Sequence, residues 1–255
     1  MTNPQTTPNL SQRQSVVLNR VLRSGFVTIE ALAEEFGVSA QTVRRDIITL
    51  SEQGLLQRFH GGAGPIGSAE SARLDHAAKR DVAREEKQMV GARAAAAIPA
   101  GASIFLDVGT TIECCAARLS QRAGFRIFTT SIRTALLFDP DAHEVNVIGG
   151  RLSGRDGSLT GEEVILRLHD LQIDVALIAC SAVDDTARVM DFNTSKIAVK
   201  KAAMAAASSS YLLCTKSKFG RTALSTIAPT SRFQAVITES ETIWRQNSPA
   251  ATEIG

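Results

Sequence analysis

Six apolar runs of strand length, separated by helical stretches, constrain the fold of this chain more than any other feature. The runs are SIFLDV, RIFTT, EVNVIGG, DVALIAC, SYLLCT and QAVIT, all between residues 103 and 238. The helices between them are expected to begin near Thr111, Ser131, Gly161 and Thr194. Such alternation is typical of a mostly parallel sheet with helices on both faces. The sequence therefore predicts an α/β fold for this part of the chain.

A different pattern occupies the N-terminal part. Three segments carry apolar residues at helical spacing, and each is followed by a glycine: residues 12–23, 29–36 and 40–53. Thr28 and Ser39 precede the second and third segments at the positions of N-caps. Short helices separated by tight turns are compatible with a helix-turn-helix. The LLQRFHGGA that follows is expected to form a two-stranded wing.

These patterns divide the chain into two predicted domains. A length of 255 residues exceeds the usual size of one domain. GGAGPIGSAES has the composition of a linker, and the Ala-rich stretch over 79–98 predicts a helix that Pro99 ends. We expect a winged helix-turn-helix over residues 12–63, a linker over 64–78 and an α/β domain over 79–245.

The third predicted helix has a polar face suited to DNA. On a helical wheel, Val43, Ile47 and Leu50 share the buried face, and Gln41, Arg44 and Arg45 lie opposite. Arg can fork onto guanine, Gln onto adenine, and Arg can also clamp a phosphate. Hydroxyls at the helix N-terminus and cations on the wing would add backbone contacts. The candidate DNA-binding residues are Ser39, Gln41, Thr42, Arg44, Arg45, Arg58 and His60. The alternative is that the arginine pair is solvated surface.

Polar and glycine-rich turns follow several predicted strands of the α/β domain. The first holds Asp107, Gly109, Thr110 and Thr111, and Thr110 with Glu113 fits a capping box. The others bring Thr129, Thr130 and Ser131, then Gly149, Gly150 and Arg151, and lastly Lys216 and Lys218. Ligands of open α/β sheets bind beyond the carboxyl ends of strands, and backbone N–H groups with hydroxyls suit a phosphate. The turns therefore predict a site for a phosphorylated sugar or polyol.

Residues 28–63 resemble the N-terminal winged helix-turn-helix of the DeoR family of bacterial transcriptional regulators. The likeness lies in S-x-x-T-x-R-R-D, which begins at Ser39, and in HGGA, residues 60–63. Residues 85–238 resemble the sensor domain of the same family, whose fold is similar to ribose-5-phosphate isomerase. The resemblance implies a repressor that leaves double-stranded operator DNA when a phosphorylated sugar or polyol binds the sensor.

The resemblance also implies which residues bind the effector. They are Asp107, Gly109, Thr110, Thr111, Thr130, Ser131, Gly149, Gly150, Arg151, Lys200 and Lys218. Residues 154–162 (GRDGSLTGE) and 217–221 (SKFGR) resemble a branch of the family whose effector is glycerol 3-phosphate. Where the family usually has T-N-N, this chain has Ser131 at the third position. Where the family has E-V-R-x-K, it has Lys196 in place of the Glu and Ala198 in place of the Arg, and where the family has an Asp it has Thr215. These departures change the charge of the pocket rim, which predicts either a more anionic effector or a weaker response.

Composition and residue spacing limit the kinds of site, partner and location that this chain can have. Cys114, Cys115, Cys180 and Cys214 form no CxxC pair and no metal-ligand spacing with histidine, so no metal, disulfide framework or cofactor is expected. A net charge of +2 is too small to indicate nucleic-acid binding by itself.

Without a signal-peptide pattern or a long apolar run, the chain is expected to be cytoplasmic, with no membrane partner. A homo-oligomer, dimer or tetramer, is expected because one winged module covers a short half-site.

Two other functions compete with the regulator. In the first, the second domain is a phosphosugar isomerase, for which Asp107, Glu162, Asp184 and Asp191 are candidate bases by type. Nothing in the sequence singles out one of them, so we expect no enzyme. The second is an architectural DNA-binding protein without a ligand, which so large a polar-edged second domain disfavours.

Overall fold

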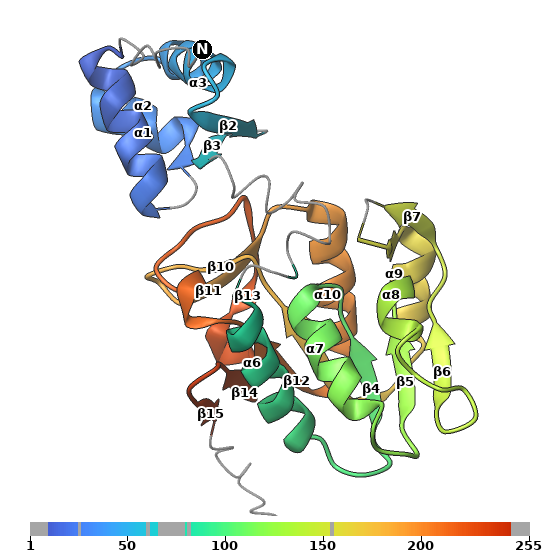
Figure 1. The fold of residues 1–255 in the computed structure, drawn as a ribbon. Helices are drawn as coiled ribbons and strands as arrows, with labels where there is room; N and C mark the ends of the chain where they lie inside the picture. The colour runs from blue at the N-terminus through green and yellow to red at the C-terminus, as the bar shows by residue number, and fades with distance from the viewer. Residues whose placement is uncertain are drawn as a thin grey trace, which may run out of the picture.

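The structure is a computed structural model, which describes residues 10–24, 27–59, 62–65, 80, 83–153 and 156–245 (Figure 1). The predicted wing residue His60 and most of the predicted linker lie outside these residues. Within them, no helix is both long and apolar enough to span a membrane.

The N-terminal part contains three helices and a small antiparallel sheet. The elements are α1 (Gln12–Ser24), β1 (Val27–Thr28), α2 (Ile29–Phe36), α3 (Ala40–Glu52), β2 (Leu56–Phe59) and β3 (Gly62–Pro65), and the sheet order is β1-β3-β2. Both predicted N-caps are confirmed: Thr28 accepts from the N–H of Ala31 at 3.1 Å, and Ser39 from that of Thr42 at 3.2 Å. The predicted wing is confirmed as β2 and β3, and β1 adds a third strand that the sequence did not predict.

The C-terminal part is built on a seven-stranded sheet with the order β15-β14-β12-β9-β4-β5-β6. The strands are β4 (Ser103–Leu106), β5 (Arg126–Thr129), β6 (Glu144–Val147), β9 (Ile173–Ala179), β12 (Ala207–Leu213), β14 (Ala235–Ile237) and β15 (Thr242–Trp244). The six predicted strands are the six that pair in parallel, and the short edge strand β15 pairs antiparallel with β14. The predicted parallel sheet is therefore confirmed.

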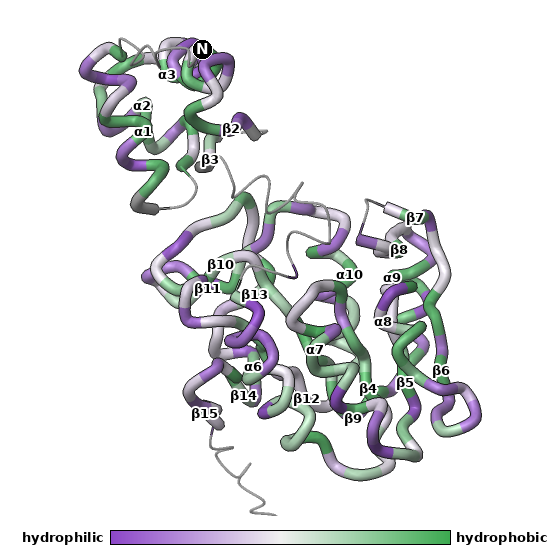
Figure 2. Tube along the Cα trace, viewed as in Figure 1, coloured by the Kyte–Doolittle hydropathy of each residue, from purple (hydrophilic) through white to green (hydrophobic). Residues whose placement is uncertain are grey.

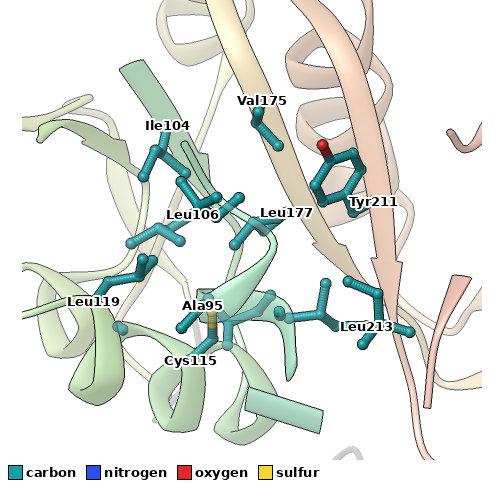
Figure 3. Packing of buried hydrophobic residues seen from close by; sticks show 14 of the residues in the cluster. Ala95, Ile104, Leu106, Cys115, Leu119, Val175, Leu177, Tyr211 and Leu213 are labelled. Carbon is teal, nitrogen blue, oxygen red and sulfur yellow. The ribbon is translucent and has the colours of Figure 1, made fainter. Parts of the chain in front are cut away.

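Alternate residues of the strands feed two separate cores, because successive side chains point to opposite faces. Ile104 and Leu106 pack with α6 (Arg84–Ala96) and α7 (Thr110–Leu119), whereas Phe105 packs with α9 (Glu162–His169) and α10 (Thr194–Ala206). Figure 3 shows the first core, to which Leu106 and Leu177 of the sheet and Cys115 and Ala95 of the covering helices belong. The central strands are strongly hydrophobic in Figure 2, as a doubly covered parallel sheet requires.

Shorter elements decorate this sheet. They are α8 (Ile132–Ala135), the hairpin β7 (Arg151–Ser153) and β8 (Ser158–Thr160), the sheet of β10 (Ala182–Val183), β11 (Arg188–Asp191) and β13 (Ser225–Pro229), and the 3₁₀ turns η1 (Lys216–Lys218) and η2 (Thr230–Arg232). The predicted glycine-rich loop after β6 is thus a hairpin. The helix predicted over 79–98 is α6, and it begins at Arg84 because Ala83 adopts a left-handed backbone with φ 52°.

Candidate functional sites

Helix α3 exposes the polar face that the helical wheel predicts. Gln41, Arg44 and Arg45 are exposed, whereas Val43 is fully buried against α1 and α2. Ile48, the apolar residue on the outward side, is half-buried. One face of α3 therefore holds the domain together, and the other presents an amide and two guanidinium groups.

The hydroxyl of Ser39 caps the N-terminus of α3, next to the hydroxyl of Thr42. Ser39 Oγ accepts from the N–H of Thr42, and the Ser39 and Thr42 hydroxyls lie 3.0 Å apart. On the wing, Arg58 is exposed in β2 opposite Ala63 of β3. These three candidates and the exposed face of α3 belong to the same small domain.

Sequence reasoning included Asp46 in the S-x-x-T-x-R-R-D motif but did not predict that it fixes α3 on α1. Asp46 is 6% exposed, and Arg13 of α1 donates to both of its oxygens, at 2.5 Å from Nε and 3.3 Å from Nη2. The hydrogen bonds and charge of Asp46 raise the pKa of Arg13. Asp46 lies three residues after Val43, close to the buried face of the wheel, so the same wheel could have revealed it.

Two predicted effector residues pair with each other inside the sensor domain. Lys200 of α10 contacts Asp107 Oδ2 and donates to the carbonyl of Ala179 at 2.9 Å, with Asp191 at 3.6 Å. Asp107 also accepts from the N–H of Ala179 at 3.0 Å. Burial alone would lower the pKa of Lys200, but the two carboxylates outweigh burial and raise it. The pair ties the carboxyl ends of β4 and β9 to α10.

The first loop presents a helix N-terminus that lacks a side-chain cap. Gly109 is the N-cap of α7, with φ 141°, and no side chain caps the helix there. Thr110 is already the first helical residue, so the predicted capping box with Glu113 is wrong. Gly109 takes the cap position itself because its backbone lies in a region that other residues rarely adopt. Backbone N–H groups at such a terminus attract anions.

The turn after β5 uses its hydroxyls within the fold. Thr129 Oγ1 donates to the carbonyl of Leu106 at 2.7 Å, and Ser131 caps α8 by accepting from the N–H of Thr134 at 3.1 Å. Thr130 is 1% exposed, and its hydroxyl has no hydrogen-bond partner among the described residues. Thr130 is therefore the candidate in this turn whose hydroxyl the described fold does not use.

The turn after β6 contains two adjacent glycines, Gly149 and Gly150, whose surroundings differ. A Cβ at Gly150 would lie 2.5 Å from Val164 Cγ2, whereas one at Gly149 would meet nothing within 4 Å. Arg151 is exposed at the start of β7. Close packing on α9 accounts for Gly150, whereas of these two glycines Gly149 faces open space.

Two further lysines contact loops that follow strands of the sheet. Lys218 of η1 is half-buried and donates to the carbonyl of Cys180. Lys196 of α10 contacts Asp156 in the turn between β7 and β8. Thr215 is buried, with its hydroxyl 2.9 Å from that of Ser217. Asp107 and Gly109 follow β4, and Lys218 follows β12, with β9 between these two strands in the sheet. Lys200 reaches the ends of β4 and β9 from α10, whereas Arg151 follows the edge strand β6.

A hollow of about 330 Å³ lies at the opposite, amino edge of the sheet. Its charged groups already have partners: Arg126 pairs with Glu144 at 2.7 Å, and Asp174 accepts from Ser103 N and Oγ at 2.8 and 2.7 Å. We therefore place the candidate sensor site at the carboxyl edge. The described residues contain no cluster of three or more metal-ligating side chains.

Comparison with known proteins relates both domains to one family. Residues 13–69 match the DeoR-like helix-turn-helix domain, and residues 82–240 match the DeoR C terminal sensor domain. The glycerol-3-phosphate regulon repressor of Escherichia coli (strain K12) is 32% identical over 231 residues, which are 90% of each chain. The HTH-type transcriptional repressor CsqR of the same strain is 33% identical over 89% of this chain and 87% of its own.

Two further proteins show the range of similar chains. The L-fucose operon activator of Escherichia coli (strain K12) is 31% identical over 82% of this chain and 86% of its own. Among solved structures, ribose 5-phosphate isomerase A from Methanocaldococcus jannaschii aligns with a TM-score of 0.39 and 17% identity over 54% of this chain and 55% of its own. The matches to both domain models and the near full-length relatives agree with the two-part fold. The chain therefore belongs to the DeoR family of transcriptional regulators, with a helix-turn-helix DNA-binding domain followed by a sensor domain.

Proposed function

We propose that the protein is a cytoplasmic repressor that binds operator DNA as a homo-oligomer. A phosphorylated polyol or sugar in the sensor domain releases it from the operator. Relatives named as glycerol-3-phosphate regulon repressors support an effector of the glycerol 3-phosphate type. The oligomer follows from the short half-site that one winged module covers.

Two unpaired guanidinium groups carry the DNA-binding part of the proposal. Arg44 and Arg45 are exposed beside Gln41, and within the described residues neither has a carboxylate partner. In the same domain, Arg13 and Arg20 are paired, with Asp46 and Glu35 respectively. Two unpaired cations next to an amide suit the phosphates and base edges of a major groove.

The remaining DNA contacts would come from the edges of this face. The hydroxyls of Ser39 and Thr42 stand at the N-terminus of α3, where the helix dipole favours a phosphate. Arg58 would contact a flanking phosphate from the wing. These contacts would fix the register of the protein on the duplex, and the arginines of α3 would read its sequence.

The effector part rests on the open N-terminus of α7. Gly109 and Thr110 offer backbone N–H groups to a phosphoryl group, and the half-buried Lys218 supplies a cation at the carboxyl end of β9, the strand next to β4. Asp107 and Lys200 are buried behind this loop, so we assign them the role of holding it rather than contacting the effector.

The experiment that tests the proposal is a DNA release assay. The purified chain first selects its operator from genomic fragments, and sugar and polyol phosphates, including glycerol 3-phosphate, are then titrated into the complex. The proposal predicts that at least one phosphate releases the DNA. A complex that persists with every phosphate at millimolar concentration would exclude this effector class, and increased transcription from the occupied operator would identify an activator.

A further inference from the structure

Lys196 links the start of α10 to the β7–β8 hairpin through an ion pair. Its ammonium contacts Asp156 Oδ2, and each of the two side chains is 20% exposed. The backbone N–H of Lys196 is held by the N-cap Asn193 at 3.0 Å. Lys200 lies one helical turn further along the same face of α10. Two lysines thus project from one side of this helix.

The two lysines differ in what they can still bind. Lys200 is 2% exposed, and Asp107, the Ala179 carbonyl and Asp191 surround its ammonium. In the described part of the chain, Asp156 is the one acceptor that Lys196 contacts, so two of its three N–H donors lack a protein acceptor there. Of these two lysines, Lys196 is therefore the one that an incoming anion can reach.

Asp156 is held as an anion in the turn of the hairpin. Its Oδ1 accepts from Ser158 Oγ at 2.9 Å and from Ser158 N at 3.4 Å. Burial alone would raise the pKa of Asp156, but Lys196 and Ser158 outweigh burial and hold it below its usual value. Leu159, which follows Ser158, donates its backbone N–H to the carbonyl of Thr130 at 2.7 Å. The Asp156 carboxylate therefore lies on a segment joined to the turn that carries the unused Thr130 hydroxyl.

We propose that Lys196 is a ligand of the effector's phosphoryl group, and that the Asp156 carboxylate occupies the place of this anion in the free protein. The inference rests on the proposed function, because it adds a ligand to the same sensor site. A phosphate monoester carries a charge of about −1.5 to −2 and three strong acceptor oxygens. It can therefore displace the Asp156 carboxylate and accept from the donors of Lys196 that one carboxylate oxygen leaves unused.

The proposal makes Asp156 an internal competitor of the effector. Removing its charge then strengthens effector binding, whereas a purely structural ion pair would weaken binding when either partner is removed. The gain also depends on Lys196, because without this ammonium the two anions no longer compete for the same cation. This opposite sign separates a ligand position from a structural contact.

The test is calorimetric titration of the full chain with glycerol 3-phosphate, extended to other sugar and polyol phosphates if it does not bind. We expect Asp156→Asn and Asp156→Ser to lower the Kd roughly fivefold, the upper end of the effect of a partly exposed ion pair. Lys196→Gln should raise the Kd at least as much, and Lys196→Gln with Asp156→Asn should match Lys196→Gln alone. Lys201→Gln, which changes an exposed lysine of α10, should match the wild type.

Three results would overturn the inference. The first is weaker binding by both Asp156 variants, and the second is wild-type affinity in every variant. In both cases the wild type binds a phosphate, so the proposed function is retained and the assignment of Lys196 as an effector ligand is rejected. The third is a wild type that binds none of the phosphates at millimolar concentration, which removes the proposed function and this inference together.

Discussion

Lys200 of α10 and Asp107 at the end of β4 pair inside the sensor domain, where their side chains are 2% and 3% exposed. Loss of one partner would leave a buried charge without compensation. We expect Lys200→Met to lower the free energy of unfolding by about 3–5 kcal/mol, measured by urea denaturation. Lys201→Met is the control on the exposed side of the helix. Equal stability of the two variants would refute a structural role for the pair.

The Arg13–Asp46 pair predicts a separate effect on the DNA-binding domain. Asp46→Asn removes the charge that Arg13 binds, and Arg13 is about a third exposed, which reduces the loss. We expect destabilisation of about 1 kcal/mol and weaker operator binding because α3 is held less firmly. Thermal melts with operator titrations measure both. Arg20→Ala, which breaks the exposed pair with Glu35, should leave both quantities nearly unchanged, and an equal loss there would remove any special role for Asp46.

The two glycines after β6 give a matched pair of variants. Gly150→Ala would place a methyl group 2.5 Å from Val164 Cγ2, so we expect overpacking to cost about 1–3 kcal/mol. Gly149→Ala would meet nothing within 4 Å and should be tolerated. Thermal denaturation compares them. If Gly150→Ala is as stable as Gly149→Ala, the packing explanation for Gly150 is wrong.

Asp184 predicts how stability depends on pH. Burial would raise the pKa of this carboxyl, but hydrogen bonds from Arg188 and Thr186 and the charge of Arg188 hold it below the usual value. The stability it contributes is then complete above about pH 4 and is lost as the pH falls through the lowered pKa. Asp184→Asn should therefore be less stable at neutral pH and lose less stability on acidification. Parallel curves of unfolding free energy against pH would contradict this.

The long-range architecture was predictable because its signals are local. Six apolar runs marked the six parallel strands, and Thr28 and Ser39 marked two helix starts through caps that involve only neighbouring residues. The hairpin β7–β8 was missed because strands of three residues, rich in polar side chains, give no periodic signal. The capping box at Thr110 failed because Gly109, one residue earlier, could occupy the cap position.

The candidate sensor site was less predictable, because its side chains are paired across the fold. Lys200 and Asp107 are 93 residues apart in sequence, so nothing local shows that they neutralise each other. Lys196 likewise meets Asp156 from 40 residues away. Sequence could name the residue types at the strand ends, but their pairing decides which remain available to an effector.

Operator affinity of Arg44→Ala and Arg45→Ala, measured across a range of salt concentrations, tests the central claim most directly. Removing an arginine that reads a base should cost about 1–3 kcal/mol, and removing one that binds a phosphate should reduce the salt slope by about 1. Arg20→Ala is the control, because its guanidinium is already paired with Glu35. The account predicts weaker binding for both α3 variants, with effector affinity unchanged. Wild-type affinity and salt slope in both would contradict the assignment of α3 as the DNA-reading helix.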